Sequence, residues 1–231
     1  GEILSPPRDL VEVLTLAERI SQKTDGALDV TVKPALDLYK ENQNVPPQVM
    51  QLVDYRLLDI SEHIISLPDP GMAVTLDGIA KGWIVDQVSA KFSSLGYTST
   101  LVEAGGDLYL DGKSAGMDAW RVGLRHPRDQ HQNTFSGQDL GLATSGDDQH
   151  AFSEDFTHHH ILDPRLGFSP RELSSVTVSA PTAAEADGLS TAIMVLGVKD
   201  GLKLVENWSG VETLLVDKNG HKHLSSGFNG S

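Results

Sequence analysis

The sequence contains no cysteine. That absence excludes disulfides, thiolate metal sites and cysteine nucleophiles together, and it is compatible with an oxidising compartment without requiring one. Long apolar runs are also missing, because the longest, such as 193–196, are far too short to span a bilayer. No signal peptide is visible, yet the chain begins Gly-Glu rather than with methionine, so we expect a processed or shortened form.

Basic residues are few. The chain has 18 Lys and Arg against 32 Asp and Glu, which gives a formal net charge of −14. Such a field repels a nucleic-acid backbone, so we expect no nucleic-acid partner. A small phosphate ligand is still compatible with this charge, because a bound divalent cation would invert the local sign. For most of the acidic residues the simpler interpretation is solubility.

The composition is that of an ordinary globular protein, with 39% hydrophobic and 22% charged residues in a length of 231. Such a chain can bury one core, or two lobes that share one. Apolar spacing and turn residues predict helices over 10–20, 35–39, 47–55, 84–95, 183–196 and 200–208. Strands are predicted around 64 and over 73–76, 99–102, 108–110, 120–125, 140–144, 174–180, 213–216 and 221–224. Antiparallel hairpins with a few helices favour an α+β fold with antiparallel sheets.

The helix predicted over 84–95 is amphipathic. Ile84, Val88, Phe92 and Leu95 fall on one of its faces, and Gly96 ends it. It follows the turn Asp77-Gly78, so that strand, glycine turn and helix form one compact unit.

The first candidate site lies in the helix predicted over 183–196. Thr182 and Glu185 fit a capping box, and Asp187, Ser190 and Thr191 fall on one face of the helix. Oxygen ligands presented together suit a hard cation such as Mg²⁺. From spacing alone, an aspartate placed near a helix N-terminus for its dipole is the better interpretation.

The second candidate is the turn from Thr75 to Gly82. Lys81 stands at the start of a helix after a glycine turn, where it could meet a phosphate or a flavin carbonyl beside free backbone N–H groups. Neither the Walker spacing nor the dinucleotide-binding glycine pattern is present. In isolation, a solvated surface lysine is the more probable interpretation.

Three consecutive histidines form the third candidate. In a strand His158 and His160 would share a face and His159 would point away, so the three cannot all bind one metal ion. A single histidine could serve as a general base near neutral pH. Asp163 and Arg165 are expected to pair with one another or to brace the proline turn. Two glycine-rich turns, 103–107 and 143–147, allow close backbone approach to a ligand but also occur in ordinary turns.

Six of these segments form an ordered set that covers most of the chain: Thr24–Pro34, Leu76–Gly82, Ala104–Asp107, Ala143–Gly146, His160–Arg165 and Ala186–Thr191. Together they resemble the ApbE family of FAD:protein FMN transferases. No single segment is decisive, whereas six in register make coincidence hard to credit. The resemblance implies one ApbE-like domain over 1–231, with a T-fold-like α+β architecture of antiparallel sheets and packed helices.

The resemblance also implies an activity. Such an enzyme binds FAD as its substrate, cleaves the pyrophosphate with Mg²⁺, transfers FMN to a threonine hydroxyl of an acceptor protein and releases AMP. Carried over by position, Asp187 and Thr191 would be side-chain ligands of the magnesium ion. Ser190 and the carbonyl of Gly78 would be nearby ligands.

The remaining expected roles concern the flavin. The resemblance implies that Lys81 and Thr75 line the flavin site, that Tyr39 forms a neighbouring wall and that Ile161 contacts the cofactor. His160 would be the base for the incoming hydroxyl.

The chain departs from the family pattern in three places. Thr75 stands where many members have aspartate, and Leu166 replaces a common threonine. Family members usually begin with further residues, including a Met-Gly-Thr strand that helps to close the flavin pocket, whereas this sequence starts close to its first helix.

Two alternative functions follow from the same residues. An FAD pyrophosphatase would use water in place of the threonine and release FMN and AMP, and a flavin-binding or scaffold protein would bind FAD without turnover. Members of the family are commonly exported and lipid-anchored in bacteria, so we expect a periplasmic or cell-envelope location. Because the chain has no cysteine, a lipid anchor of the full-length form would not be attached to this segment.

Overall fold

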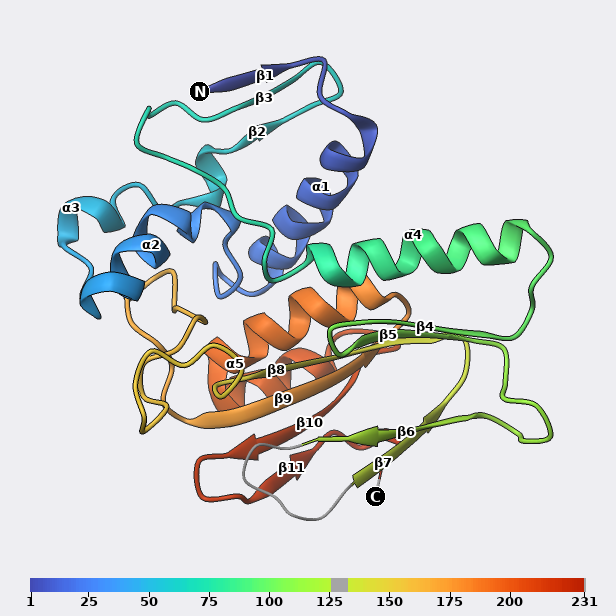
Figure 1. The fold of residues 1–231 in the computed structure, drawn as a ribbon. Helices are drawn as coiled ribbons and strands as arrows, with labels where there is room; N and C mark the ends of the chain where they lie inside the picture. Colours follow the sequence, from blue (N-terminus) through green and yellow to red (C-terminus); the bar gives the residue numbers. More distant parts are fainter. Residues whose placement is uncertain (126–132, 231) are drawn as a thin grey trace. The chain divides into compact units, whose positions relative to one another are not determined.

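The computed structural model describes residues 1–125 and 133–230 (Figure 1). Contacts between residues group the chain into two compact units. Unit 1 comprises Gly1–Gly78 and Asp147–Pro170, and unit 2 comprises Ile79–Gly146 and Arg171–Ser231. The expectation of one family domain over the whole length stays a prediction. Among the described helices, none is both long and apolar enough to cross a membrane.

Unit 1 combines a small sheet with short helices. Its antiparallel sheet has the order β1 (Glu2–Leu4), β3 (Ile64–Ser66), β2 (Asp59–Ile60). The helical segments are α1 (Arg8–Lys23), the 3-10 turn Val30–Val32, α2 (Lys33–Asn42), α3 (Pro47–Met50) and the 3-10 turn Tyr55–Leu57. The amphipathic α1 buries Val13, Leu14, Ala17 and Ile20, as its spacing predicts.

Two predictions for unit 1 are wrong. Residues 73–76 form no strand in the described chain. The Thr75 N–H donates to the carbonyl of Val30 at 2.8 Å. One isolated backbone hydrogen bond does not make a strand pair, even in a segment with high β-propensity. The helix expected over 47–55 is split into α3 and the turn Tyr55–Leu57, because Asp54 accepts from the N–H of Arg56 and caps a new turn.

Unit 2 is built on an antiparallel sheet of six strands, in the order β11-β10-β9-β8-β5-β4. The bounds are β4 Thr100–Ala104, β5 Asp107–Asp111, β8 Leu140–Gly146, β9 Leu173–Ala180, β10 Glu212–Asp217 and β11 Lys222–Leu224. Each coincides with a predicted strand, and Gly220, with φ of +84°, makes the Asn-Gly turn between the last two. Every residue of the central strand β9 is buried.

Both faces of this sheet are covered. The helices α4 (Ala80–Ser94) and α5 (Ala183–Glu206) pack on one face, α4 against β4 and β5, and α5 against β8 and β9. On the other face an apolar cluster joins the sheet to the hairpin of β6 (Trp120–Leu124) and β7 (Asn133–Gly137) (Figure 1). The cluster consists of Leu110, Leu124, Phe135, Leu142, Leu214 and Phe228.

The two helices predicted over 183–196 and 200–208 are joined in α5. Gly197, with φ of +79° and ψ of −175°, leaves the helical conformation between them. The strand β7 was not predicted, because its sequence Asn-Thr-Phe-Ser-Gly has only one large apolar residue. The arrangement of packed helices and antiparallel sheets confirms the α+β prediction.

Candidate functional site

The first turns of α4 and α5 in unit 2 cap one another. Asp86 of α4 accepts hydrogen bonds from the backbone N–H groups of Ala183 and Ala184, at 2.8 and 2.9 Å. In return Asp187 of α5 accepts from the N–H of Gly82 at 3.1 Å. Each carboxylate satisfies donors that a helix N-terminus leaves unpaired, and each lies at the positive end of the other helix. The two helix starts are therefore held together by a reciprocal pair of caps.

The predicted N-cap of α5 is present as well. The Thr182 hydroxyl accepts from the N–H of Glu185 at 3.1 Å. The carboxylate of Glu185 accepts from the indole N–H of Trp208, also at 3.1 Å, which ties the first turn of α5 to the residue just past its end.

Two glycines allow the first turn of α5 to fit. A Cβ atom on Gly82 would lie 2.2 Å from the carbonyl oxygen of Ala183, and one on Gly141 of β8 would lie 2.2 Å from the backbone nitrogen of Ala183. Both contacts are with backbone, which cannot turn aside as a flexible side chain can. The start of α5 is thus enclosed between α4 and β8, and this close packing fixes the position of Asp187.

Lys81 joins two buried carboxylates. Its ammonium group is bound to Asp107, at the start of β5, and lies 3.7 Å from a carboxylate oxygen of Asp187. The side chains of Asp107 and Asp187 are almost fully buried, whereas that of Lys81 is half-exposed. Solvent therefore reaches this cluster on the side of the lysine.

The charges of the cluster perturb one another. Burial, reinforced by the neighbouring Asp107 carboxylate, raises the pKa of Asp187 to about 7, although Lys81 and the Gly82 N–H lower it. Burial also raises the pKa of Asp107. For Lys81 burial acts in the opposite sense, but the two carboxylates outweigh it and its pKa is raised. With both carboxylates ionised, one positive and two negative groups would leave an excess of negative charge, which a bound cation would neutralise.

A cluster of hydroxyls lies on the same helix face as Asp187. The Ser145 hydroxyl of β8 lies 2.8 Å from that of Ser190 and 3.3 Å from that of Thr191. Ser190 also donates to the backbone carbonyl of Asp187 at 2.9 Å, so the Ser145 hydroxyl is the donor toward Ser190. The structure therefore confirms that Asp187, Ser190 and Thr191 share one face of the helix.

The donor set fits a hard cation. No described group of three or more His, Cys, Asp or Glu residues could hold a metal ion. Magnesium, however, commonly takes one or two carboxylates and completes its octahedron with waters and substrate phosphates. Asp187 with the hydroxyls of Ser190 and Thr191 supplies oxygen ligands of this kind.

The three consecutive histidines of unit 1 have separate environments. The Tyr39 hydroxyl accepts from the N–H of Ser169 at 3.2 Å and forms a hydrogen bond of 2.7 Å with His158 Nδ1. The buried His159 places Nε2 3.1 Å from the carbonyl of Pro170. Tyr39 is itself buried in an apolar cluster with Ala35 and Leu162.

His160 differs from its neighbours. Its ring packs edge-on against that of His150, with centroids 5.2 Å apart, and its buried Nδ1 has no hydrogen-bond partner among the described residues. Burial, together with His159 and His150, lowers the pKa of His160 to about 4. The imidazole is therefore neutral near pH 7, which is the state a proton acceptor requires.

The other predicted residues of unit 1 are less informative. Thr75 accepts from the N–H of Asp77 at 3.3 Å within the turn that contains Gly78, and Ile161 is buried. The binding roles expected for Thr75, Gly78 and Ile161 stay predictions.

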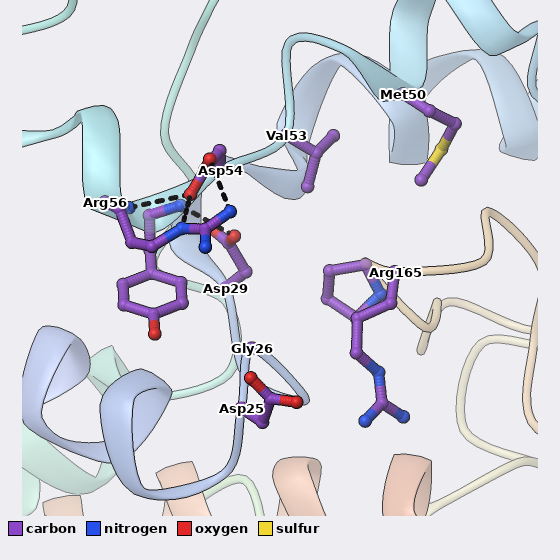
Figure 2. Close-up of a pocket in the computed structure, with 10 residues that line it drawn as sticks. Asp25, Gly26, Asp29, Met50, Val53, Asp54, Arg56 and Arg165 are labelled. Carbon is purple, nitrogen blue, oxygen red and sulfur yellow. Dashed lines mark hydrogen bonds and ion pairs between the residues drawn. The ribbon is translucent and has the colours of Figure 1, made fainter.

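A polar cavity of about 300 Å³ also lies within unit 1 (Figure 2). In the figure the Arg56–Asp54 pair lies on one side of it and Arg165 on the other. The predicted pairing of Asp163 with Arg165 is confirmed, with bonds of 2.9 and 2.8 Å between the two side chains. The lining residues are Asp25, Gly26, Asp29, Met50, Val53, Asp54, Tyr55, Arg56, Pro164 and Arg165, and none of the predicted flavin-site residues is among them.

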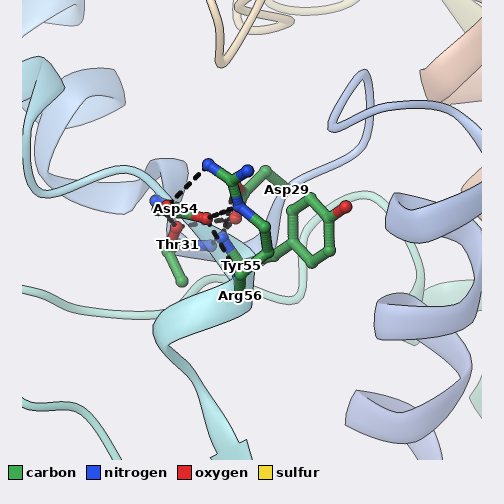
Figure 3. A network of polar contacts seen from close by, with 5 residues as sticks. All are labelled: Asp29, Thr31, Asp54, Tyr55 and Arg56. Atoms are coloured by element: carbon green, nitrogen blue, oxygen red, sulfur yellow. Dashed lines mark hydrogen bonds and ion pairs between the residues drawn. The ribbon is translucent and has the colours of Figure 1, made fainter.

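One wall of this cavity is a hydrogen-bonded network (Figure 3). Asp29 accepts from the N–H and hydroxyl of Thr31 and from the N–H of Tyr55, and Thr31 accepts from the N–H of Asp54. Arg56 holds Asp54 through two side-chain bonds and lowers the pKa of that carboxyl. These groups bond to one another, so the network explains how the loops are held together and points to no particular ligand.

Comparison with known proteins decides the family. A protein-family model described as the ApbE family matches residues 2–215, nearly the whole chain. The chain belongs to the ApbE family. The resemblance found in the six segments is thereby confirmed.

Two FAD:protein FMN transferases are similar to this chain over almost the whole of its length. The FAD:protein FMN transferase of Haemophilus influenzae is 33% identical over 239 positions, which cover 94% of this chain and 69% of that protein. The FAD:protein FMN transferase of Vibrio cholerae is 34% identical over 230 positions, covering 93% and 69%.

Solved ApbE structures have the same fold. The flavin transferase ApbE from Vibrio cholerae superposes with a TM-score of 0.86 at 29% identity, covering 97% of this chain and 77% of that one. The ApbE protein of Thermotoga maritima also gives 0.86 at 29% identity, with 96% and 77% covered.

The candidate site of this ApbE chain includes three residues that the sequence did not single out. Asp107 and Ser145 belong to the two segments that the sequence predicts as glycine-rich turns and that were considered only for their backbone. In the structure Asp107 begins β5 and Ser145 lies within β8, so the turn expected at Ser145-Gly146 is wrong. Asp86 follows Lys81 by five residues. The signal available for Asp107 and Ser145 was a polar side chain next to a glycine turn. The long-range pairing with Lys81 and Ser190 has no local signature.

Proposed function

We propose that this chain is a Mg²⁺-dependent FAD:protein FMN transferase that moves FMN from FAD to a threonine hydroxyl of an acceptor protein and releases AMP. Family membership and the names of its relatives support flavin transfer. The observation that assigns particular residues to this function is the half-exposed Lys81 held between the buried carboxylates of Asp107 and Asp187. The hydroxyls of Ser190 and Thr191 share a helix face with Asp187 and meet Ser145.

The cluster has properties that the reaction requires. Lys81 offers a half-exposed cation to the dianionic pyrophosphate, and Asp107 orients it through an ion pair. Asp187, Ser190 and Thr191 would hold Mg²⁺, with the Gly78 carbonyl as the further ligand proposed from the family. When bound, Mg²⁺ would neutralise charge on the phosphate oxygens. The ion would also replace the proton that Asp187 retains near neutral pH.

The proposed reaction is a phosphoryl transfer. The threonine oxygen bonds to the phosphorus of the FMN moiety, the bond from that phosphorus to the bridging oxygen breaks, and AMP leaves with the electron pair. The hydroxyl proton goes to a base, for which we propose His160. Its neutral imidazole and unpaired Nδ1 suit that role.

The remaining assignments belong to the same proposal. Thr75 and Lys81 would contact the flavin, Ile161 would pack against it and Tyr39 would form a neighbouring wall. A periplasmic or cell-envelope location is likewise proposed, and fractionation of cells that produce the tagged full-length protein tests it.

Product analysis tests the activity. The chain is incubated with FAD, Mg²⁺ and a verified flavin-acceptor protein, and we expect a fluorescent acceptor band on a denaturing gel together with AMP in equal amount. AMP and free FMN without a labelled band would identify a pyrophosphatase instead. FAD binding without either product would identify a flavin-binding protein and contradict the proposal. In Asp187→Asn both products should be lost while the fold, followed by circular dichroism, is retained.

A further inference from the structure

The helix α4 exposes an apolar face. Ile84, Val88 and Phe92 recur every four residues along it, and Leu95 and Tyr97 continue the row past its end. We call these five residues the α4 stripe. Ile84 is 51% exposed and Leu95 62%, and Phe92 meets Tyr97 edge-on with ring centroids 5.7 Å apart. An apolar helical face of this kind ordinarily packs against a core.

The stripe cannot turn inward. An adjoining side of α4, formed by Gly82, Val85 and Ser89, is already buried, and α4 packs against α5. The backbone contact of Gly82 with Ala183 and the bonds of Asp86 to the first turn of α5 fix the rotation of the helix. The exposure of the stripe is therefore a consequence of how unit 2 is packed.

The stripe begins at the candidate site. Lys81 precedes Ile84 by one helical turn, which corresponds to about 5 Å along the axis. Side chains on a helix lean toward its N-terminus, so the stripe leans toward the end that carries Lys81 and its two carboxylates. A protein bound along the stripe would bring part of its own chain to the cluster.

We propose that the α4 stripe is the docking surface for the acceptor protein, a proposal that rests on the proposed function. The partner it fits presents apolar side chains next to its target threonine, because none of the five stripe residues is charged. At about 100 Å² for each side chain, the stripe offers about 500 Å² of apolar surface, which is within the range of functional patches on single proteins. A stable dimer needs about 800 Å² from each partner, so this area suits a complex that forms and dissociates at every turnover.

The test separates docking from chemistry. Val88→Ser with Leu95→Ser removes apolar surface from the stripe. Met117→Ser is the matched control, since Met117 belongs to another segment of unit 2, between β5 and β6, and is 49% exposed. FMN transfer is measured over a range of acceptor concentrations. We expect the stripe variant to raise KM for the acceptor about tenfold while kcat and FAD affinity stay unchanged. The control should have the KM of the wild type.

Four other outcomes would overturn the docking proposal. An unchanged KM in the stripe variant refutes it and leaves the proposed function standing. An equal rise of KM in the Met117→Ser control would show that loss of any exposed apolar side chain weakens acceptor binding, so that the stripe has no special role. A wild-type dimer that the stripe variant dissociates, with KM unchanged, assigns the stripe to a second copy of the chain. If the wild type modifies no verified acceptor, the proposed function is wrong and the docking proposal falls with it. Leu95→Ser alone, at a highly exposed position, provides a second variant should the double variant fold poorly.

Discussion

Replacing Gly82 by alanine should separate α4 from α5. The new Cβ would lie 2.2 Å from the carbonyl oxygen of Ala183, 2.5 Å from its carbonyl carbon and 2.8 Å from the Cα of Ala184. Favourable contacts between such atoms lie at about 3.5 Å or more, so the helices must move apart by about 1 Å. That movement lengthens the bond from the Gly82 N–H to Asp187 and shifts the neighbouring Lys81.

The expected loss of stability follows from opposing terms. Overpacking of this kind costs about 1–3 kcal/mol, and loss of a buried hydrogen bond to a charged group costs about 1.5 kcal/mol more. Alanine gains about 1 kcal/mol over glycine within a helix. The free energy of unfolding should therefore fall by about 2 kcal/mol. Because a displacement of about 1 Å at a phosphate-binding group can cost about 100-fold in rate, FMN transfer should fall by at least about tenfold.

Urea unfolding and the transfer assay measure these effects. Gly123→Ala in β6 is the matched control, because a Cβ there meets no atom within 4 Å. The control should stay within about 1 kcal/mol of the wild type. If Gly82→Ala were as stable and as active as the control, the close packing of the two helix starts would be wrong.

Two further predictions concern pH and helix capping. The pKa of His160 falls to about 4 in the folded chain, where His159, His150 and Asp77 are its charged neighbours, against about 6.5 when unfolded. The unfolded state thus binds the extra proton first, and this group removes stability as the pH falls from about 6.5 to 4, by up to about 3 kcal/mol. His160→Gln should flatten that loss in urea titrations at pH 7 and 4.5, and a slope equal to that of the wild type would contradict the burial argument. Asp86→Asn removes the charge that caps the first turn of α5 and should cost about 1 kcal/mol at pH 7. An unchanged thermal midpoint would show that these two bonds contribute little.

Local signals predicted much of unit 2. The Asn-Gly turn before β11 and the glycines that end α4 and interrupt α5 all have positive φ in the structure. Glycine adopts this conformation at little cost, so such residues mark element ends in the sequence itself. The prediction of a strand over 73–76 is wrong because local sequence does not show whether a partner strand is present. Strand formation needs a partner as well as propensity, and no ladder forms there.

Only part of the candidate site could be predicted from the sequence. A shared helix face for Asp187, Ser190 and Thr191 follows from spacing, since the period of a helix is fixed. The pairing of Lys81 with Asp107, 26 residues away, depends on how β5 and α4 pack. The exposure of the α4 stripe also depends on packing. Periodicity in the sequence identifies an apolar helix face but does not tell whether the fold buries it.

The central claim is that the cluster of Lys81, Asp107 and Asp187 performs Mg²⁺-dependent FMN transfer. Mass spectrometry of a verified acceptor protein tests it most directly, with wild type and Asp187→Asn compared at increasing Mg²⁺ and with a chelator. We expect one FMN added per acceptor by the wild type only when Mg²⁺ is present, and none by the variant at any concentration. Equal labelling by Asp187→Asn, or labelling by the wild type in the presence of the chelator, would contradict it.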